Sequence, residues 1–450
     1  MSVLARETFD FQSAFEALEK REEKNFPSWV RSLRRTALGK FSQIGFPTPR
    51  EEDWKYTNVT SLGKIPFRFS FDPFVDGLKS KKGVEALILG RSVGQLLVFV
   101  NGIYSRALSR IPSSIKGVRA GSLSDAMREH PELVEPHLGK IAPYEQSGFT
   151  ALNTAFVRDG AFVYLAEGKV AEEPIQLLFI ATPSQENQVI LPRNLVIAEK
   201  GSKATLVEHY ISLSSDSYFT DIVTEVVLKE GTTIDHYKLQ REGKEHAYHI
   251  ATTQVRLERD SKYSSFSISL GAKLGRENLN VLLEGEGARC FLNGLYLVSG
   301  GRHIDHHTLI DHLKPRGTSR QLYKGIVDGK STAVFSGKIF VRKDAQKTDA
   351  EQTNKTLLLS EEATVDAKPQ LEILADDVKC SHGAAVGQLD EDQLFYLKSR
   401  GLDSKTARDI LTYAFMSEVV SRVEKEDIRS GLDRFLWAWL EKREAREIGA

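Results

Sequence analysis

A charged or glycine-containing turn recurs through the middle of the chain, and a β-pattern resumes after each copy. The copies read EKGSKATL at Glu199, KEGTTIDH at Lys229, ERDSKYSS at Glu258, GEGARCFL at Gly285 and VDGKSTAVF at Val327. The first four begin 30, 29 and 27 residues apart. A period of about 20 to 50 residues is typical of stacked repeats, in which each coil buries its apolar face against its neighbours. The pattern predicts a mainly β fold built on a right-handed parallel β-helix, with a β-sandwich of regular hairpins as the alternative.

Helical patterns flank this β-rich region. Phe11, Phe15 and Leu18 recur at helical spacing, and a second amphipathic run extends from Trp29 to Phe41. Helical periodicity returns after Gly401, where an apolar face with one polar interruption is formed by Ile410, Leu411, Ala414, Phe415, Glu418 and Val419. Between them, residues 95–100 predict a strand that ends at Asn101-Gly102. We therefore expect an N-terminal helical region (1–60), a mixed α/β region (61–172), a β-helix core (173–400) and a C-terminal helical domain (401–450).

Composition narrows the functional classes. The 450 residues carry 61 basic and 61 acidic side chains, so no net charge draws the chain to nucleic acid or to an anionic membrane. No run approaches the roughly 18 apolar residues of a membrane helix, and the amino terminus lacks the basic and apolar segments of a secretory signal. With two cysteines, a disulfide framework is not indicated. We expect a cytoplasmic protein with both thiols reduced.

One of these cysteines offers the best chemical handle in the sequence. Cys380 lies two positions before His382, and on a strand both side chains point to the same face. A thiolate and an imidazole together form half a site for iron or zinc. Four-coordinate zinc and the common iron-sulfur clusters need four ligands, and the other cysteine, Cys290, is remote in sequence. The pair therefore predicts a ligand set that this chain cannot complete, unless Cys380 is simply a small buried residue.

The sequence HIDHHTLIDH forms the densest group of imidazoles. On a strand His303, Asp305 and His307 share one face, while His306 and His312 share the other. Two imidazoles and a carboxylate could bind zinc, although no HExxH helix supports a zinc enzyme. The alternative is a set of polar positions on a repeat face or at a subunit contact.

Nucleotide binding by this chain is not expected. KGIVDGKST at residues 324–332 is similar to a phosphate-binding loop, but only three residues separate Gly325 from Gly329 and a strand-like run follows. Near the other end, Phe415, Phe435, Trp437 and Trp439 lie in the helical segment. These aromatics pack into the domain's own core or form a docking surface.

The flanking sequences carry a family resemblance. KCSHGAAVGQLDEDQLFYLKSRGL, from Lys379 to Leu402, resembles the shared signature of the SufB/SufD family of iron-sulfur cluster assembly proteins. The stretch from Ser319 to Ser360 and the PQLEILADDVK approach to Cys380 resemble the same family. REEDWKYTNV, beginning at Arg50, is similar to the SufD pattern, and the chain lacks the amino-terminal cysteine cluster of many SufB proteins.

The resemblance implies a β-helical, non-enzymatic subunit. It implies pairing with a SufB-like paralogue through the β-helix, with a homodimer of the isolated chain left open. It also implies recruitment of the ABC ATPase SufC by the C-terminal helices, with Phe415, Phe435, Trp437 and Trp439 as contacts. Cys380 and His382 match the family's assembly region, where iron or a transient cluster would be shared with the partner.

Three rival functions come from other classes. A β-helical polysaccharide-acting enzyme would be active as a monomer. A zinc hydrolase centred on His303, Asp305 and His307 would hold zinc in the isolated protein. A structural paralogue would use Cys380 and His382 only for interface packing.

Overall fold

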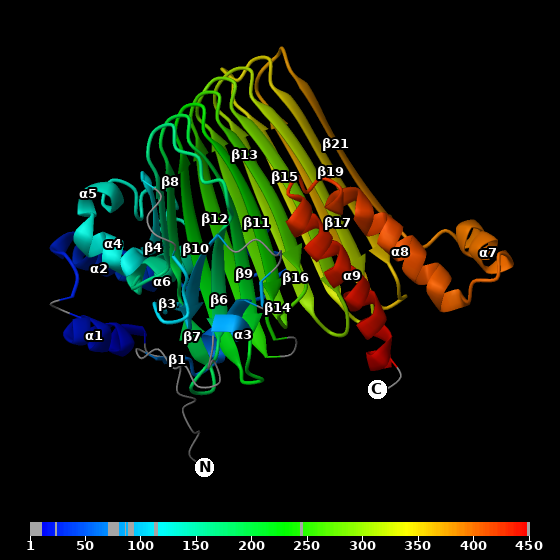
Figure 1. Cartoon of the computed structure of the whole chain (residues 1–450), viewed down its shortest axis with the longest axis horizontal. Helices are drawn as coiled ribbons and strands as arrows, with labels where there is room; N and C mark the ends of the chain where they lie inside the picture. Colours follow the sequence, from blue (N-terminus) through cyan, green and yellow to red (C-terminus); the bar gives the residue numbers. More distant parts are fainter. Residues whose placement is uncertain are drawn as a thin grey trace.

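The chain folds as a parallel β-solenoid with helices at both ends (Figure 1). The computed structural model describes residues 11–22, 25–70, 81–85, 87–88, 94–111, 116–243 and 246–447. Two long sheets face each other, and successive strands alternate between them. The predicted β-helix with flanking helices is thereby confirmed, and the sandwich alternative is wrong because neighbouring coils pair in parallel register.

The first sheet has eleven strands. In spatial order its main path is β20 (Thr364–Ile373), β18 (Thr332–Val341), β16 (His303–His312), β14 (Leu274–Leu283), β12 (Ala247–Leu257), β10 (Tyr218–Leu228), β8 (Arg193–Ala198), β5 (Ala161–Leu165) and β4 (Val118–Ser122). Two short strands join it beside β10, namely β7 (Gln188–Ile190) and β1 (Arg68–Phe69).

The second sheet has ten strands. In spatial order these are β21 (Lys379–Gly387), β19 (Asp349–Leu358), β17 (Thr318–Val327), β15 (Arg289–Val298), β13 (Lys262–Ser269), β11 (Thr233–Arg241), β9 (Lys203–Ser212), β6 (Ile175–Ala181), β2 (Gln95–Val100) and β3 (Ile103–Tyr104). The predicted strand 95–100 is β2, and Asn101 and Gly102 form its turn with positive φ angles of 49° and 81°.

The recurring turns join the two sheets at one side of the solenoid. In the first four, residues with positive φ angles occupy equivalent positions: Gly201, Gly231, Asp260 and Gly287. Their N–H groups donate to carbonyls of the following coil, as from Gly201 to Glu230 at 2.9 Å. The turn at Val327 instead runs from the second sheet back to the first, so it belongs to the opposite side.

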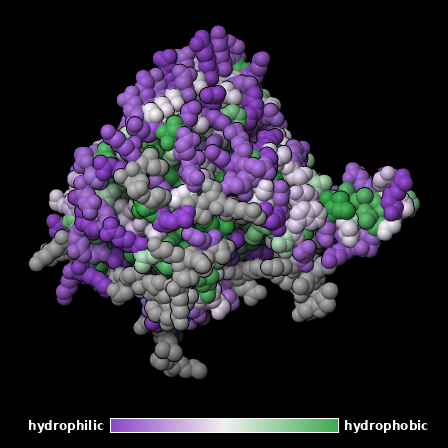
Figure 2. Space-filling model, viewed as in Figure 1, coloured by the Kyte–Doolittle hydropathy of each residue, from purple (hydrophilic) through white to green (hydrophobic). Residues whose placement is uncertain are grey.

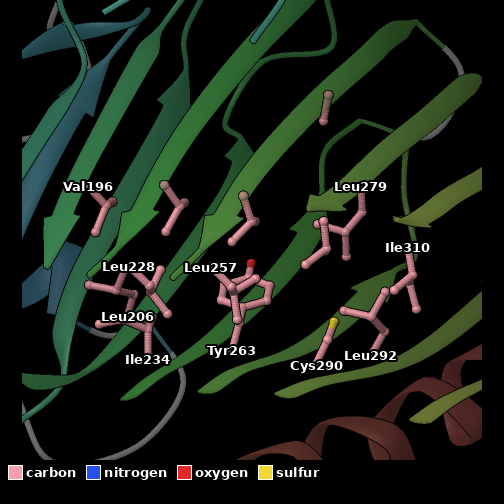
Figure 3. Packing of buried hydrophobic residues seen from close by; sticks show 14 of the residues in the cluster. Val196, Leu206, Leu228, Ile234, Leu257, Tyr263, Leu279, Cys290, Leu292 and Ile310 are labelled. Atoms are coloured by element: carbon pink, nitrogen blue, oxygen red, sulfur yellow. The ribbon is translucent and has the colours of Figure 1, made fainter. Parts of the chain in front are cut away.

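The space between the sheets is filled by side chains, as Figure 3 shows for Val196, Leu228, Tyr263, Cys290 and Ile310 among others. Strand alternation directs every second side chain inward, and these apolar residues are almost completely buried. The interior also contains polar groups. Several of these groups hydrogen-bond to each other, as Gln352 Nε2 does by donating to Gln321 Oε1 at 2.9 Å, which offsets part of the cost of burying them.

Helices pack against the flanks of the solenoid in its N-terminal and C-terminal parts (Figure 1). The N-terminal part contains α1 (Phe11–Glu22), α2 (Ser28–Ile44), η1 (Glu52–Trp54), η2 (Leu62–Lys64), α3 (Lys81–Glu85), α4 (Leu123–Glu129), α5 (Pro131–Val134) and α6 (Gly148–Ala155). The C-terminal part contains α7 (Glu391–Ser399), α8 (Ser404–Val420) and α9 (Glu426–Glu447). Within the described part of the chain, none of these helices is long and apolar enough to cross a membrane.

The two C-terminal helices α8 and α9 pack on the outer face of the second sheet. Their apolar side chains Met416, Val419, Leu432 and Leu436 join a buried cluster with outward-facing residues of the sheet, such as Leu295. Lys324 on β17 donates to the carbonyl of Phe415 at 2.8 Å. The helices are thus fixed to the solenoid by both apolar burial and a polar contact.

Candidate functional site

Cys380 and His382 lie on β21, the last strand of the second sheet. In the parallel register Cys380 pairs with Ala350 and His382 with Gln352. Cys380 packs against the apolar interior of the solenoid, and alternation along the strand places His382 on the same face. The structure therefore agrees with the prediction that the thiol and imidazole share a face.

The end of the solenoid at β20 and β21 is open. Among the described residues no further strand pairs with the outer edge of either strand, and their side chains are mostly exposed or half-buried. Cys380 is half-buried and His382 exposed. Partial burial raises the pKa of the Cys380 thiol, helped by the charge of Asp349 and opposed by a backbone hydrogen bond at Ala350. A bound cation would be needed to favour its thiolate.

The second cysteine cannot join this site. Cys290 is fully buried on β15, and burial raises the pKa of its thiol. The inward row runs from Cys290 through Ser319 and Ala350 to Cys380, so two strands separate the thiols. With neighbouring strands ~4.8 Å apart, the separation is ~14 Å. The structure thus explains why this chain offers one thiol and one imidazole at its open end.

The histidine-rich strand β16 splits between two faces as its sequence predicts. His306 and His312 are buried in the interior, whereas His303 and His307 are partly exposed on the outer face. On that face Asp305 forms an ion pair with Arg276 at 2.9 Å and contacts His307 Nε2 at 3.1 Å. Burial would raise the pKa of Asp305, but the charges of Arg276 and His307 hold it well below its usual value.

The N-terminal segment explains this outer cluster. Thr57 contacts His303 Nε2 at 2.9 Å and donates to Asp305 at 2.5 Å. Arg276 donates to the carbonyl of Asp53 at 2.6 Å, and its guanidinium lies 3.7 Å from the centre of the Trp54 ring. Polar contacts with His303, Asp305 and Arg276 therefore hold the REEDWKYTNV segment against the first sheet.

These contacts disfavour the predicted zinc site at His303, Asp305 and His307, which stays a prediction. Asp305 already pairs with a guanidinium that an incoming metal would have to displace. Among the described residues, no group of three or more His, Cys, Asp and Glu side chains is arranged to hold a metal ion. His307 and Trp54 line an open groove of about 340 Å³ on the same face.

Three of the four aromatic docking candidates contribute to packing. Phe415, Phe435 and Trp439 lie against the apolar cluster between the C-terminal helices and the second sheet. Lys324 Nζ lies 4.3 Å from the centre of the Phe415 ring. Trp437 is the exception, with 40% of its surface exposed and its ring stacked on Tyr413 at 4.4 Å.

Helix α7 carries two aromatic side chains that are more exposed than Trp437 and that were not among the docking candidates from the sequence. Phe395 is 73% exposed and Tyr396 57% exposed. The helix projects from the solenoid at the far end of the C-terminal part, where Figure 2 shows apolar surface. The run LFYLK provided the signal, since Phe395 and Tyr396 are adjacent. A short helix that packs mainly on one neighbour, as α7 does on α8, cannot bury two adjacent large side chains.

The fold and this site define a class of protein: a β-solenoid with a thiol and an imidazole at an open end and an appended helical segment. Comparison with family models gives a more specific assignment than the fold class. The SufBD core domain of SUF-system FeS cluster assembly matches residues 179–415, and the SufBD N-terminal region matches residues 6–177. The chain belongs to the SufBD family of the SUF system of FeS cluster assembly.

Individual relatives cover most of the chain. The iron-sulfur cluster assembly SufBD family protein slr0076 of Synechocystis is 32% identical, covering 89% of this chain and 88% of its own. Protein ABCI7, chloroplastic, of Arabidopsis thaliana is 34% identical over 85% of this chain and 80% of its own. Iron-sulfur cluster assembly protein SufD of Escherichia coli is 32% identical over 87% and 89%.

Proposed function

We propose that this chain is a SufD-like, non-catalytic subunit of an iron-sulfur cluster assembly scaffold. Its open solenoid end would pair with a SufB-like paralogue, and iron or a nascent cluster would be the cargo handled there. The observation that carries the proposal is the position of Cys380 and His382 on the inward face of the last strand, at the open end of the solenoid. Half a ligand set at an unpaired edge calls for a partner that supplies both strand and ligands.

The backbone of β21 supports pairing at that edge. Lys379 N–H donates to the carbonyl of Thr348, so Lys379 faces β19. Alternate residues of a parallel strand bond to opposite neighbours, so the backbone groups of His382, Ala384 and Val386 face the unpaired side. They form a row of donors and acceptors suited to an incoming strand.

The neighbouring edge of β20 is less suited to strand addition. Thr364 N–H donates to Ser331 on the side of β18, so odd-numbered residues of β20 face outward. Pro369 is one of these residues and has no N–H to donate. We therefore assign the partner's first strand to β21 and expect β20 to contribute side-chain contacts.

At this interface Cys380 and His382 would each supply one ligand to the cargo. A thiolate and an imidazole suit iron, and the remaining ligands must come from the partner. The partner's cation would also favour loss of the Cys380 proton, which the chain alone disfavours. A chain that only contributes ligands needs no catalytic base of its own.

The ATPase would dock on the C-terminal helices. Exposed Phe395 and Tyr396 on α7, with Trp437 on α9, provide the aromatic contacts, whereas Phe415, Phe435 and Trp439 support the helices from within. Residues 324–332 form the end of β17, a turn and the start of β18, without the helix of a phosphate-binding loop. ATP would therefore bind to a SufC-like subunit.

Two experiments test the proposal. Tagged full-length protein, purified from native lysate, should bring down an ABC ATPase and a SufB-like paralogue in stoichiometric amounts, predominantly from the cytoplasm. A His382→Ala variant should keep this complex and lose cluster delivery to an apo-acceptor, because one ligand is missing. Isolation of the chain alone, or normal delivery by the variant, would contradict the proposal.

A further inference from the structure

A ladder of buried polar side chains inside the solenoid ends directly below His382. Gln321 on β17 and Gln352 on β19 pair in register, and His382 follows on β21. Gln352 Nε2 donates to Gln321 Oε1 at 2.9 Å, and Gln321 Nε2 donates to Thr308 Oγ1 at 2.7 Å. Both amides are at most 2% exposed. Each glutamine thus donates an N–H of its side-chain amide to the preceding coil, away from the open end.

The last rung leaves one acceptor unused. Gln352 Oε1 is buried and accepts no hydrogen bond. Because its Nε2 points down to Gln321, the carbonyl oxygen is available to the coil above. A Cβ at Gly337 on the opposite sheet would lie only 2.0 Å from Gln352 Nε2, so the amide fits closely between two coils. The next inward side chain above it in register is His382.

We propose that Gln352 is a positioning residue that fixes the ring of His382, an inference that rests on the ligand role proposed for that histidine. The exposed His382 ring would turn toward the unused Gln352 Oε1 and donate the N–H of one ring nitrogen to it. A neutral imidazole has one N–H donor and one lone pair, so holding the donor leaves the other nitrogen free for iron. Ligating histidines usually donate their second nitrogen to such an acceptor.

The residue in register with Cys380 offers no comparable acceptor, so the proposed positioning applies to the histidine alone. Ala350, the register partner of Cys380, has no polar side chain, and Ser319 and Cys290 follow it. The Cys380 side chain can rotate about one bond, and its thiol has no tautomers between which a neighbour would have to select. The imidazole has two possible tautomers, and a hydrogen bond to Gln352 Oε1 would favour one of them.

The first test uses the metal-free full chain labelled with ¹⁵N-histidine. Long-range ¹H–¹⁵N spectra report the tautomer of each ring, and His382→Ala identifies the signals of His382 among the eleven histidines. We expect one dominant tautomer in the wild-type chain, a mixture in Gln352→Leu and recovery in Gln352→Glu, which keeps an acceptor oxygen. Thr308→Val, two rungs lower, is the matched control and should leave the tautomer unchanged.

An unchanged tautomer in Gln352→Leu would overturn the inference, and so would equal effects of Gln352→Leu and Thr308→Val. A second arm measures Co²⁺ binding to the complex with the SufB-like subunit by visible absorption. Loss of the second hydrogen bond should weaken Co²⁺ binding about 10- to 100-fold in Gln352→Leu, with recovery in Gln352→Glu. If His382→Ala leaves Co²⁺ binding intact, the ligand role itself fails, whatever the tautomer data show.

Discussion

Two pairs, each of one tyrosine and one glycine, show how closely side chains are packed inside the solenoid. Tyr296 pairs in register with Gly325, and Gly294 pairs with Tyr323. A Cβ at Gly325 would lie 1.8 Å from the Tyr296 ring, and one at Gly294 would lie 2.1 Å from the Tyr323 ring. Each ring therefore occupies space that only glycine leaves on the neighbouring coil. The fit is reciprocal between β15 and β17.

We predict that Gly325→Ala lowers the free energy of unfolding by about 1–3 kcal/mol, because the added methyl group forces the buried Tyr296 ring to move. Urea unfolding monitored by circular dichroism measures the change. Gly121→Ala is the control, since no atom lies within 4 Å of its added Cβ and its φ is not positive. Equal stability of the two variants would show that the interior relaxes around Tyr296 more freely than its packing indicates.

A second prediction concerns His312, which is fully buried beside Ser319 Oγ at 3.0 Å. Burial lowers the pKa of His312 from 6.5 to about 4. The folded state therefore binds fewer protons than the unfolded state between these values, and the free energy of unfolding should fall as the pH drops from about 6.5 to 4. The total loss is on the order of 3 kcal/mol.

Urea unfolding across this pH range checks the effect, and His312→Gln should flatten the dependence because the neutral amide does not titrate. Further loss at lower pH is expected from Glu208. Burial would raise its pKa, but the charge and hydrogen bond of His236 lower the pKa to about 2. An unchanged slope in His312→Gln would assign the pH dependence to other groups.

At the residue scale the sequence predicted part of the candidate site. Strand alternation placed Cys380 and His382 on one face, and the structure agrees. The role of Gln352 could not be predicted, because it depends on register between coils of unequal length. The sequence separation between register partners differs from coil to coil: Tyr248 pairs with Leu274, whereas Thr332 pairs with the more distant Thr364. These separations depend on the turn lengths, which are known only from the folded chain.

At the scale of elements, α1 and α2 were expected from their periodicity, whereas the buried face of α8 was predicted only in part. Of the face predicted for α8, Val419 is buried and Phe415 packs on the apolar cluster, but Ala414 and Glu418 are exposed. Met416 and Val420, which the pattern did not include, are buried. The outer surface of the second sheet determines which side of the helix is covered. That surface is assembled from strands remote in sequence, so helical periodicity alone could not orient α8.

Helix α7 should bind the ATPase without contributing much to stability. Phe395→Asp removes an exposed aromatic and adds a charge, so we predict loss of the ABC ATPase from the purified complex with little change in melting temperature. Affinity purification and thermal unfolding measure the two effects. Leu432→Ala is the contrast, because Leu432 is 1% exposed and its truncation should cost about 2–5 kcal/mol. Full ATPase retention by Phe395→Asp would move the docking surface away from α7.

At the scale of the whole molecule, the turn period predicted the solenoid but not which end stays open. The first coils are covered by α1, α2 and α6 and by the antiparallel strands β3 and β4, whereas β20 and β21 remain uncovered among the described residues. A repeat without a cap leaves unpaired backbone groups and apolar surface, which favours association. The proposed ligand pair and the proposed association surface therefore lie on the same last coil.

Substitution of one backbone donor tests this view of the molecule. Ala384 directs its N–H to the unpaired side of β21, because Lys379 directs its own N–H to β19. Ala384→Pro therefore keeps the bonds to β19, removes one donor and places a ring where a partner strand would lie. We predict at least about tenfold weaker association with the SufB-like subunit, since a lost ladder bond and a steric clash together exceed about 1.4 kcal/mol.

Sedimentation of the purified subunits measures the association, and Ala384→Val is the matched control because it adds bulk at the same position but keeps the N–H. Ala385→Pro provides the opposite case. Its N–H faces β19, so this variant should lower the melting temperature as well as weaken association. If Ala384→Pro pairs as tightly as Ala384→Val, the partner does not add a strand to β21, and the interface must rest on side chains of β20 and β21 alone.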